Sequence, residues 1–335
     1  LPALAPCMAE DAGVAVGLAL QQRRGTPSSR STVGTVTTLS NSLRILFSRA
    51  GSYPAGASPL DSDAFSPNTA AGACPECHGV LMELKEGSNV RFRCHTGHAY
   101  SLETLLKKMD KLSIEQAIST NTYVLDHLDF AYGAQLGSDL YRRSSGRIRS
   151  YHYYHPGKQA QSLAAMDRYV DDPAYVGIKI HPSWALTSAD DERWRPVWEY
   201  AAAHKLPILA HTWDLSPTNP KQAYAFPARF EKFVREYPGV KLILAHSGGR
   251  CGGIRAAAEL GQKYPNVYVD IAGDIWPNGF LEFMARAIGA ERILFGSDYT
   301  MMDQELMLGV VVGASLSIPE KENILYNNAK ALFRL

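Results

Sequence analysis

Four side chains able to bind a metal or transfer a proton follow short apolar runs in the second half of the chain. His181 ends the run GIKIH, His211 ends PILAH, His246 ends LILAH, and Asp298 follows ILFGS. Imidazole and carboxylate groups are good ligands for Zn²⁺ and similar divalent cations, and both can transfer protons. If each run is a buried strand of one parallel sheet, the four side chains emerge at the same edge of that sheet.

Each of these residues could instead be structural, since hydrogen bonds alone often hold a histidine after a buried strand. For His211 and Asp298 we favour ligation of a divalent metal, with zinc the expected ion, and Asp298 could also take a proton from metal-bound water. For His246 we favour catalytic proton transfer or polarisation of a substrate. His181 could contact the substrate, or it could only orient the loop that starts at Pro182.

The elements that would position these groups alternate regularly from about residue 146 onward. Strands are expected at 149–154, 176–181, 207–211, 241–246, 267–271 and 292–295, and helices at 190–204, 227–237, 253–264 and 279–288. Alternation of strand and helix at this spacing predicts right-handed βαβ units and a parallel sheet. In an α/β barrel, polar residues at the strand ends would surround one mouth.

The composition of the whole chain bounds its partners. It has 335 residues, of which 46% are hydrophobic and 20% charged, and its formal net charge is +1. This balance fits a globular protein and gives no overall attraction to nucleic acid or to a membrane surface. No apolar run reaches the ~18 residues that would span a bilayer. We expect a small-molecule substrate and a cytoplasmic location, and a homo-oligomer remains open.

Four residues between positions 74 and 98 have the spacing of a structural zinc site. Cys74 and Cys77 are separated by two residues, and Cys94 and His98 follow, with His95 as a competing fourth ligand. Four protein ligands leave no open position, so such a zinc would stabilise a small fold without catalysing a reaction. Free thiols are the alternative. The odd total of five cysteines argues against a disulfide framework and favours a reducing compartment.

Three segments of different composition follow one another along the chain. Residues 1–73 are rich in Ser, Thr, Gly and Pro and predict a loop-rich segment. Residues 74–145 predict a zinc-ribbon-like hairpin, with strands at 80–84 and 90–93, and a helix that opens at Ser101. Residues 146–335 form the region of alternating strands and helices. The chain is therefore predicted to contain an α/β, TIM-barrel-like region after two small segments.

Six motifs in the third segment occur in the order found in one enzyme family. YVGIKIHP, LPILAHTW, VKLILAHSGG, NVYVDIAG, RILFGSDY and NILYNNAKALF resemble the amidohydrolase-related, metal-dependent hydrolases. The resemblance implies a TIM barrel and hydrolysis, hydration or nonoxidative decarboxylation of small carboxylated or aromatic substrates. It implies His211 as the metal ligand after strand five, His246 as the catalytic histidine after strand six, and Asp298 as the acidic ligand and base after strand eight.

The family's first strand supplies two further ligands in a His-x-His or Glu-x-His motif, and no such motif stands in place here. By motif order RIRSYHYYHP resembles the third strand, so the barrel is predicted to be incomplete, with strands three to eight. His152 and His155 could substitute for the missing ligands. Residues three apart on a strand point to opposite faces, so at most one of them could reach the metal.

The first two segments resemble other families. Residues of about 74–120 resemble the Cys/His-rich tail of chemotaxis methylesterase-type proteins, and residues of about 5–79 resemble the excinuclease damage-recognition ATPase. The phosphate-binding G-x-x-x-x-G-K-[ST] loop of that ATPase is missing, so neither ATPase activity nor DNA binding is carried over. A zinc-stabilised excinuclease-like fragment or a non-catalytic binding module is the alternative to an enzyme. The chain could be a genuine fusion or a composite of three pieces.

Overall fold

The computed structural model describes residues 84–86, 89–93, 99–120, 122–273, 277–299, 302 and 304–335. Contacts divide the chain into two compact units, of which one spans residues 12–107 and the other includes residues 108–335. Each unit is described by itself below. The predicted boundaries after residues 73 and 145 stay predictions.

The described strands of the first unit form a small antiparallel sheet in the order β1–β2–β3. Their bounds are β1 Leu84–Glu86, β2 Asn89–Arg93 and β3 Ala99–Ser101, and α4 (Leu102–Lys111) begins directly after β3. β1 and β2 pair antiparallel, with Glu86 opposite Asn89, in the segment where the sequence predicts a hairpin. Cys74, Cys77, Cys94 and His98 lie outside the described residues, so the structural zinc site stays a prediction.

The second unit is built on a seven-stranded parallel sheet. The strands are β4 Ala117–Ser119, β5 Ile148–Tyr153, β6 Tyr175–Ile180, β7 Ile208–His211, β8 Leu242–Ala245, β9 Val267–Asp270 and β10 Ile293–Leu294. They pair in sequence order, as consecutive βαβ units require. The predicted TIM-barrel-like fold is confirmed, and the sheet has one strand, β4, beyond the six expected.

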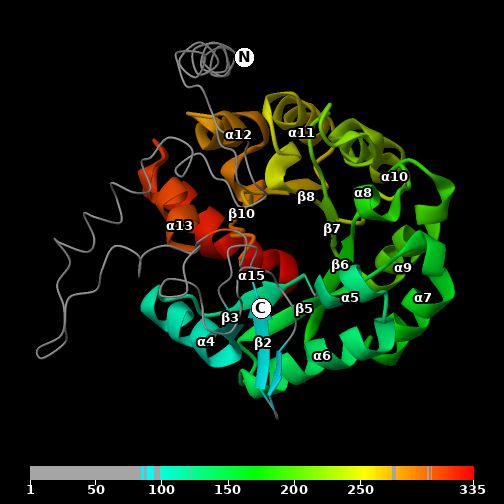
Figure 1. Cartoon of the computed structure of the whole chain (residues 1–335). Helices are drawn as coiled ribbons and strands as arrows, with labels where there is room; N and C mark the ends of the chain where they lie inside the picture. The colour runs from blue at the N-terminus through cyan, green and yellow to red at the C-terminus, as the bar shows by residue number, and fades with distance from the viewer. Residues whose placement is uncertain are drawn as a thin grey trace, which may run out of the picture. The chain divides into compact units, whose positions relative to one another are not determined.

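Helices connect the strands, and most of them lie on the outer side of the sheet formed by β5 to β8, whereas α15 packs on its inner face (Figure 1). They are α5 Thr122–His127, α6 Phe130–Arg143, α7 Gln159–Arg168, α8 Pro182–Ala185, α9 Arg195–His204, α10 Glu231–Glu236, α11 Cys251–Lys263, α12 Phe280–Ile288, α13 Gln304–Gly313, α14 Ile318–Glu322 and α15 Asn328–Phe333. The predicted helices correspond to α9, α10, α11 and α12. The sequence analysis did not predict α5, α6, α7, α8, α13, α14 and α15.

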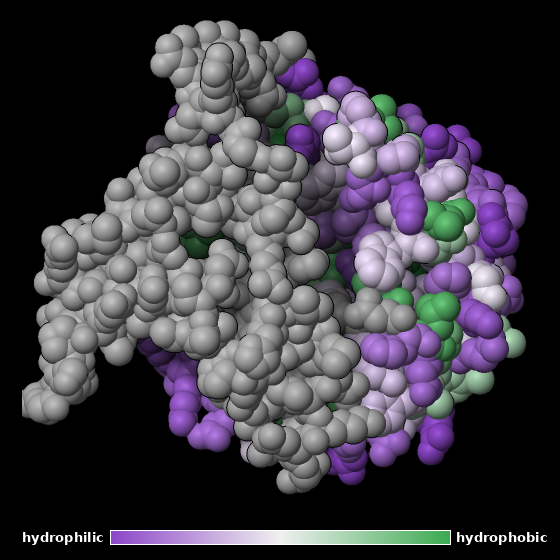
Figure 2. Space-filling view, viewed as in Figure 1, coloured by the Kyte–Doolittle hydropathy of each residue, from purple (hydrophilic) through white to green (hydrophobic). Residues whose placement is uncertain are grey.

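The main core lies between the sheet and this outer helical layer. Residues of β6 to β10 that point outward pack against α9 to α12, and the rings of Trp198 and Phe233 stack at 5.6 Å between α9 and α10. Such amphipathic helices bury an apolar stripe and expose a polar one. Figure 2 shows the resulting surface, which is mainly hydrophilic with scattered hydrophobic residues where its colour is visible.

A second, smaller core covers the inner face of the sheet. Leu209, Ile243 and Leu294 point inward and pack with Phe333 of the C-terminal helix α15. The ring of Phe333 meets Tyr151 of β5 edge-on at 5.9 Å. No pairing joins β4 to β10 among the described residues, so this sheet remains open. Helix α15 therefore buries part of the face that a closed barrel would fill with its own side chains.

His152 and His155, the substitute ligands considered above, have structural roles. His152 is buried and stacks on Tyr175 at 4.0 Å, and burial lowers its pKa to about 3. His155 precedes a short helical turn at Pro156, where its Nδ1 accepts the N–H of Gly157 at 3.1 Å. Neither imidazole joins the histidines at the ends of the neighbouring strands.

Two observations concern the helices and the cysteines. No helix in the described ranges is long and apolar enough to cross a membrane. Cys251, the first residue of α11, is disulfide-bonded, which differs from the expectation that the cysteines are reduced. A cytoplasmic location stays a prediction.

Candidate active site

Three histidines meet at the C-terminal ends of neighbouring strands. His181 follows β6, His211 ends β7, and His246 follows β8, and all three are buried. The rings of His181 and His211 stack with their centroids 3.9 Å apart, and His246 stands at a steep angle to His211 at 5.0 Å. The sheet thus brings together the three histidines that the sequence analysis selected.

Hydrogen bonds fix which ring nitrogen carries the proton. Nδ1 of His246 lies 3.0 Å from the carbonyl oxygen of Ala272, which can only accept, so Nδ1 donates and Nε2 keeps a lone pair. His181 is the opposite case, since its Nδ1 accepts the Trp184 N–H at 3.4 Å and its Nε2–H is the donor. His246 can therefore take up a proton at Nε2, and His181 can donate a hydrogen bond.

His211 is engaged by a glutamine. Its Nε2 lies 3.0 Å from the amide oxygen of Gln222, which also accepts the hydroxyl of Ser183 at 2.9 Å. An amide oxygen only accepts hydrogen bonds, so the ring proton of His211 is on Nε2. Gln222 lies in a short helical turn after β7 and Ser183 in α8 after β6, so this contact also joins the two connections.

Burial keeps two of the histidines neutral. Desolvation lowers the pKa of His181 well below its usual value, and the charges of Lys179 and His246 act in the same direction. The pKa of His211 is likewise lowered well below its usual value, by burial first and then by His181 and His246. Since both rings stay uncharged near pH 7, they act as hydrogen-bonding groups.

A carboxylate missed by the sequence analysis holds the turn that carries His246. Asp270, the last residue of β9, accepts the backbone N–H of His246 at 2.8 Å and that of Ala272 at 3.0 Å, both at Oδ1. Burial raises the pKa of Asp270. A signal was present, because NVYVDIAG ends its apolar run in a polar residue as the three histidine motifs do.

The backbone after β8 turns sharply at this point. His246 and Ser247 have φ values of 64° and 47°, a left-handed conformation that costs about 1–2 kcal/mol per non-glycine residue. Gly248 and Gly249 follow with φ of 87° and 77°, where glycine has no such penalty. A side chain on Gly249 would also meet the ring of Trp213. The turn therefore needs its two glycines and the hydrogen bond from the His246 N–H to Asp270.

Trp213 forms an aromatic wall beside the histidines. Its ring is parallel to His211 within 3° at 6.2 Å and meets His246 at a steep angle at 5.6 Å. On the other side of the row, Trp184 stands beside His181 at 6.0 Å and is 57% exposed. Planar rings thus border the histidines on both sides, an arrangement suited to an aromatic ligand.

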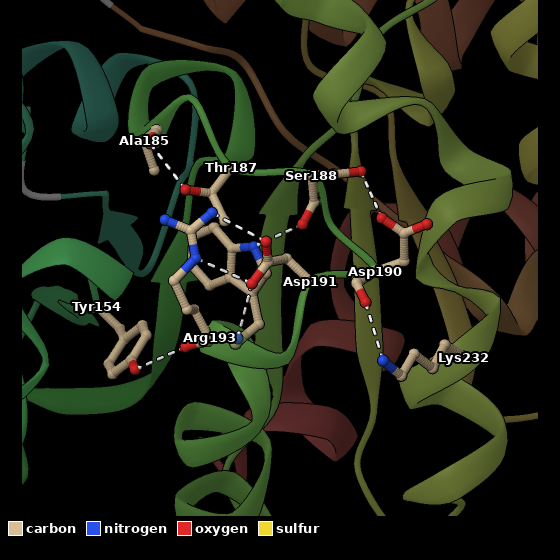
Figure 3. A network of polar contacts seen from close by, with 9 residues as sticks. Tyr154, Ala185, Thr187, Ser188, Asp190, Asp191, Arg193 and Lys232 are labelled. Atoms are coloured by element: carbon tan, nitrogen blue, oxygen red, sulfur yellow. Dashed lines mark hydrogen bonds and ion pairs between the residues drawn. The ribbon is translucent and has the colours of Figure 1, made fainter.

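A polar network fixes the loop between β6 and α9, which carries Trp184. Figure 3 shows that carbonyl and carboxylate oxygens of the loop accept hydrogen bonds from side chains of the loop itself and from Tyr154 and Lys232 of neighbouring elements. The contacts are Thr187 Oγ1 to Ala185 O at 2.9 Å, Ser188 Oγ to Asp190 Oδ1 at 2.5 Å, Arg193 to both oxygens of Asp191 at 2.9 Å, Tyr154 OH to Arg193 O at 3.1 Å, and Lys232 Nζ to Asp190 O at 3.1 Å. These hydrogen bonds hold the loop in one conformation.

Asp298 is placed differently from the three histidines. It follows β10 in the left-handed conformation, with φ of 51°, and its surface is exposed. Its only described link to the site is an electrostatic attraction to Lys179 of β6. The assignments of His181, His211, His246 and Asp298 to substrate, metal and catalysis stay predictions.

The described residues do not by themselves complete a metal site. Within the described ranges, no group of three or more His, Cys, Asp or Glu side chains is arranged to hold a metal ion. The in-plane lone pairs of stacked rings do not converge on one point, so His181 and His211 cannot share an ion in this arrangement. Strand β4, which enters the sheet before the first expected strand, ends in Ser119 and supplies no ligand motif. A metal would need ligands from elsewhere.

Comparison with known proteins identifies the family of the second unit. The amidohydrolase family matches residues 126–335, more than half of the chain. An uncharacterised TIM-barrel protein from Bordetella bronchiseptica superimposes with a TM-score of 0.59, at 16% identity over 70% of this chain and 83% of that chain. A dihydroxybenzoic acid decarboxylase from a Polaromonas species, solved with manganese and the inhibitor 2-nitroresorcinol, gives 0.56 at 16% identity over 87% and 93%. At such identities the two structures show a shared fold.

A different relative matches part of the chain. UvrABC system protein A of Paucimonas lemoignei is 56% identical over 80 residues, which is 23% of this chain and 12% of that protein. The chain thus spans about an eighth of the length of this relative. The predicted resemblance to the excinuclease ATPase is confirmed as a fragment, and the resemblance to methylesterase tails stays a prediction.

Proposed function

Because the chain belongs to the amidohydrolase family, we propose that it is an enzyme that hydrolyses or decarboxylates a small aromatic or carboxylated substrate at the row of three histidines. The observation that carries this proposal is the hydrogen bond from Nδ1 of His246 to Ala272. It leaves a lone pair on Nε2 of a buried imidazole, beside two other rings. Such a group can act as a general base and then return the proton as a general acid.

The proton transfers follow from these positions. In hydrolysis, His246 Nε2 takes a proton from the water that attacks a carbonyl carbon, and the protonated ring then gives it to the leaving group. In decarboxylation, a protonated His246 delivers a proton to the ring carbon that bears the carboxylate. The bond to the carboxylate then breaks, its electron pair remains on the ring, and CO₂ departs. The Nε2–H of His181 would hold a substrate oxygen in either reaction.

The proposed substrate class follows from the shape and charge of the surroundings. Trp213 and the stacked histidines offer flat apolar faces, and ring stacking favours a planar aromatic ligand. The solved structure of a dihydroxybenzoic acid decarboxylase holds 2-nitroresorcinol, itself a small aromatic molecule. A small hydroxylated benzoic acid is therefore the first substrate to test.

The proposal includes a divalent metal bound by His211 and Asp298, although these two residues alone are an incomplete set of ligands. Two ligands bind a metal weakly, so further ligands would have to come from outside the described residues. Metal content measured by plasma mass spectrometry tests this. The site is supported if both His211→Ala and Asp298→Ala lose the metal. The control variant His204→Ala, at an exposed position, should retain it.

The activity itself is tested by turnover. The isomers of dihydroxybenzoic acid, together with simple anilides and esters, are incubated with the protein, and loss of CO₂ or release of product is followed by mass spectrometry. We expect turnover of at least one class, and a loss of about 100-fold or more in kcat for His246→Asn. The matched variant His204→Asn should keep wild-type turnover. Equal rates for both variants would refute the role of His246.

The relative in the excinuclease family favours a second candidate function for the first segments. A zinc-stabilised module on Cys74, Cys77, Cys94 and His98 would bind a protein or nucleic acid without catalysis. The test is the variant Cys74→Ser. If it loses zinc but keeps turnover, the two functions belong to separate parts of the chain.

A further inference from the structure

A lysine that the sequence analysis did not select lies in the wall of the site. Lys179 is the fifth of six residues of β6, and strand alternation puts its side chain on the same face as His181. In the sheet it pairs with Leu209, whose side chain points to the inner face. Only 7% of the Lys179 surface is exposed. Its amine is therefore enclosed beside the row of histidines.

The ammonium of Lys179 has no direct partner. Within the part of the chain that the structure describes, it takes part in no hydrogen bond and no ion pair. The carboxylates of Asp270 and Asp298 attract it only through space. Asp270 already uses Oδ1 to accept two backbone N–H groups, and Asp298 is exposed. A charge on a buried amine is costly, and burial lowers the pKa of Lys179 to about 8, so an anionic oxygen bound at this amine would offset that cost.

We propose that Lys179 and the Nε2–H of His181 together form the binding site for the carboxylate of an aromatic acid. The inference rests on the proposed function, because it names the anchoring group of the substrate at that same site. The donors lie two residues apart, Lys179 in β6 and His181 directly after it, and the charge of Lys179 acts on His181 and on His211. A carboxylate has two oxygens, so one can face the ammonium while the other accepts the imidazole N–H.

The surroundings favour a monocarboxylate over a more highly charged anion. Among the described residues, Lys179 is the one lysine or arginine that is buried, so a single side-chain ammonium faces the bound group. The carboxylates of Asp270 and Asp298 would repel a second negative charge. With the carboxylate on Lys179, the ring of the acid would extend toward the flat faces of His211 and Trp213.

The test is binding, measured apart from turnover. Isothermal titration calorimetry compares benzoate with its neutral counterpart benzamide on the full chain, for wild type, Lys179→Met and Lys158→Met. Methionine keeps the length of the side chain and removes its charge, and Lys158 is an exposed control. We expect Lys179→Met to weaken benzoate by about 10- to 100-fold, the usual range for a charge-assisted hydrogen bond. Benzamide binding should change by less than about threefold, and Lys158→Met should match wild type.

Equal benzoate affinities for wild type and Lys179→Met would overturn the proposal, and so would an equal loss of benzoate and benzamide. If Lys179→Met does not fold, trace acetylation of the wild-type protein replaces it. Benzoate should then slow modification of Lys179 at least tenfold and leave Lys158 unchanged, and no protection would overturn the proposal. Selective loss of benzoate binding in a protein without turnover would support the carboxylate site while refuting the proposed function.

Discussion

Replacing Asp270 tests how the catalytic histidine is positioned. The Oδ1 atom of Asp270 accepts the N–H of His246 at 2.8 Å and that of Ala272 at 3.0 Å. In Asp270→Ala both N–H groups lose their acceptor inside a buried region. An unsatisfied buried donor costs about 1–3 kcal/mol, so the upper bound is about 6 kcal/mol. Relaxation of the strained turn at His246 returns part of this, and we expect a loss of about 3 kcal/mol.

Asp270→Asn is the matched variant. Its amide oxygen can accept the same two N–H groups, and only the negative charge is lost. Burial already raises the pKa of Asp270, so the protein does not strongly stabilise that charge. We expect Asp270→Asn to change the free energy of unfolding by less than about 1 kcal/mol. Turnover should fall about 100-fold in Asp270→Ala, where His246 is displaced, and less than about tenfold in Asp270→Asn.

Urea unfolding followed by circular dichroism gives the free energies, and the kinetic constants of the preferred substrate give the functional effect. A loss confined to kcat would mean that the variant still binds its substrate but that His246 no longer transfers the proton. The reasoning is refuted if the alanine and asparagine variants are equally stable. It is also refuted if Asp270→Ala keeps wild-type kcat, since the turn would then be held by other contacts.

Three further predictions concern stability measured by urea unfolding. The pKa of His152 is lowered to about 3, so the unfolded chain binds a proton that the folded one does not, and stability falls as pH drops below about 6.5. Between pH 7.5 and pH 5, His152→Phe should lose about 2 kcal/mol less stability than wild type, and His127→Phe, at an exposed site, should behave as wild type. Gly249→Ala should cost about 2 kcal/mol or more, because its φ of 77° is left-handed and the new methyl meets Trp213; an unchanged midpoint would contradict this. Phe333→Ala should cost about 3 kcal/mol by opening the inner core, and a loss below 1 kcal/mol would mean that α15 does not stabilise the sheet.

The sequence contained most of the information about the sheet. Each apolar run that ended in a polar residue became a strand, because burial on both faces needs an unbroken apolar segment. The strand of this sheet that was not predicted is β4. It has three residues, Ala117–Ser119, and too little periodicity to be recognised in the sequence. Helices α5, α6 and α7 were missed in the stretch between β4 and β6.

The parts of the site that escaped prediction depend on contacts between distant residues. Nothing local in NVYVDIAG says that Asp270 accepts the N–H of His246, which lies 24 positions earlier. The packing of Phe333 on Tyr151 joins positions 182 apart in the chain. Lys179 could have been found, because alternation in GIKIH places it on the face of His181. Its lack of a counter-ion is visible only in the fold.

Because the barrel is incomplete in the described residues, a lysine provides positive charge at the site where two metal ligands were expected. In the described residues the strand expected to bring two metal ligands is missing, and the three histidines are arranged to accept and donate hydrogen bonds. A positive charge in this wall of the site is then the ammonium of Lys179, whose pKa burial lowers to about 8, and a charge acts strongly among buried rings. A substrate carboxylate would satisfy that charge and bring its ring beside Nε2 of His246. Binding and proton transfer are thus assigned to separate strands, so that a variant in β6 should alter affinity and a variant after β8 should alter rate.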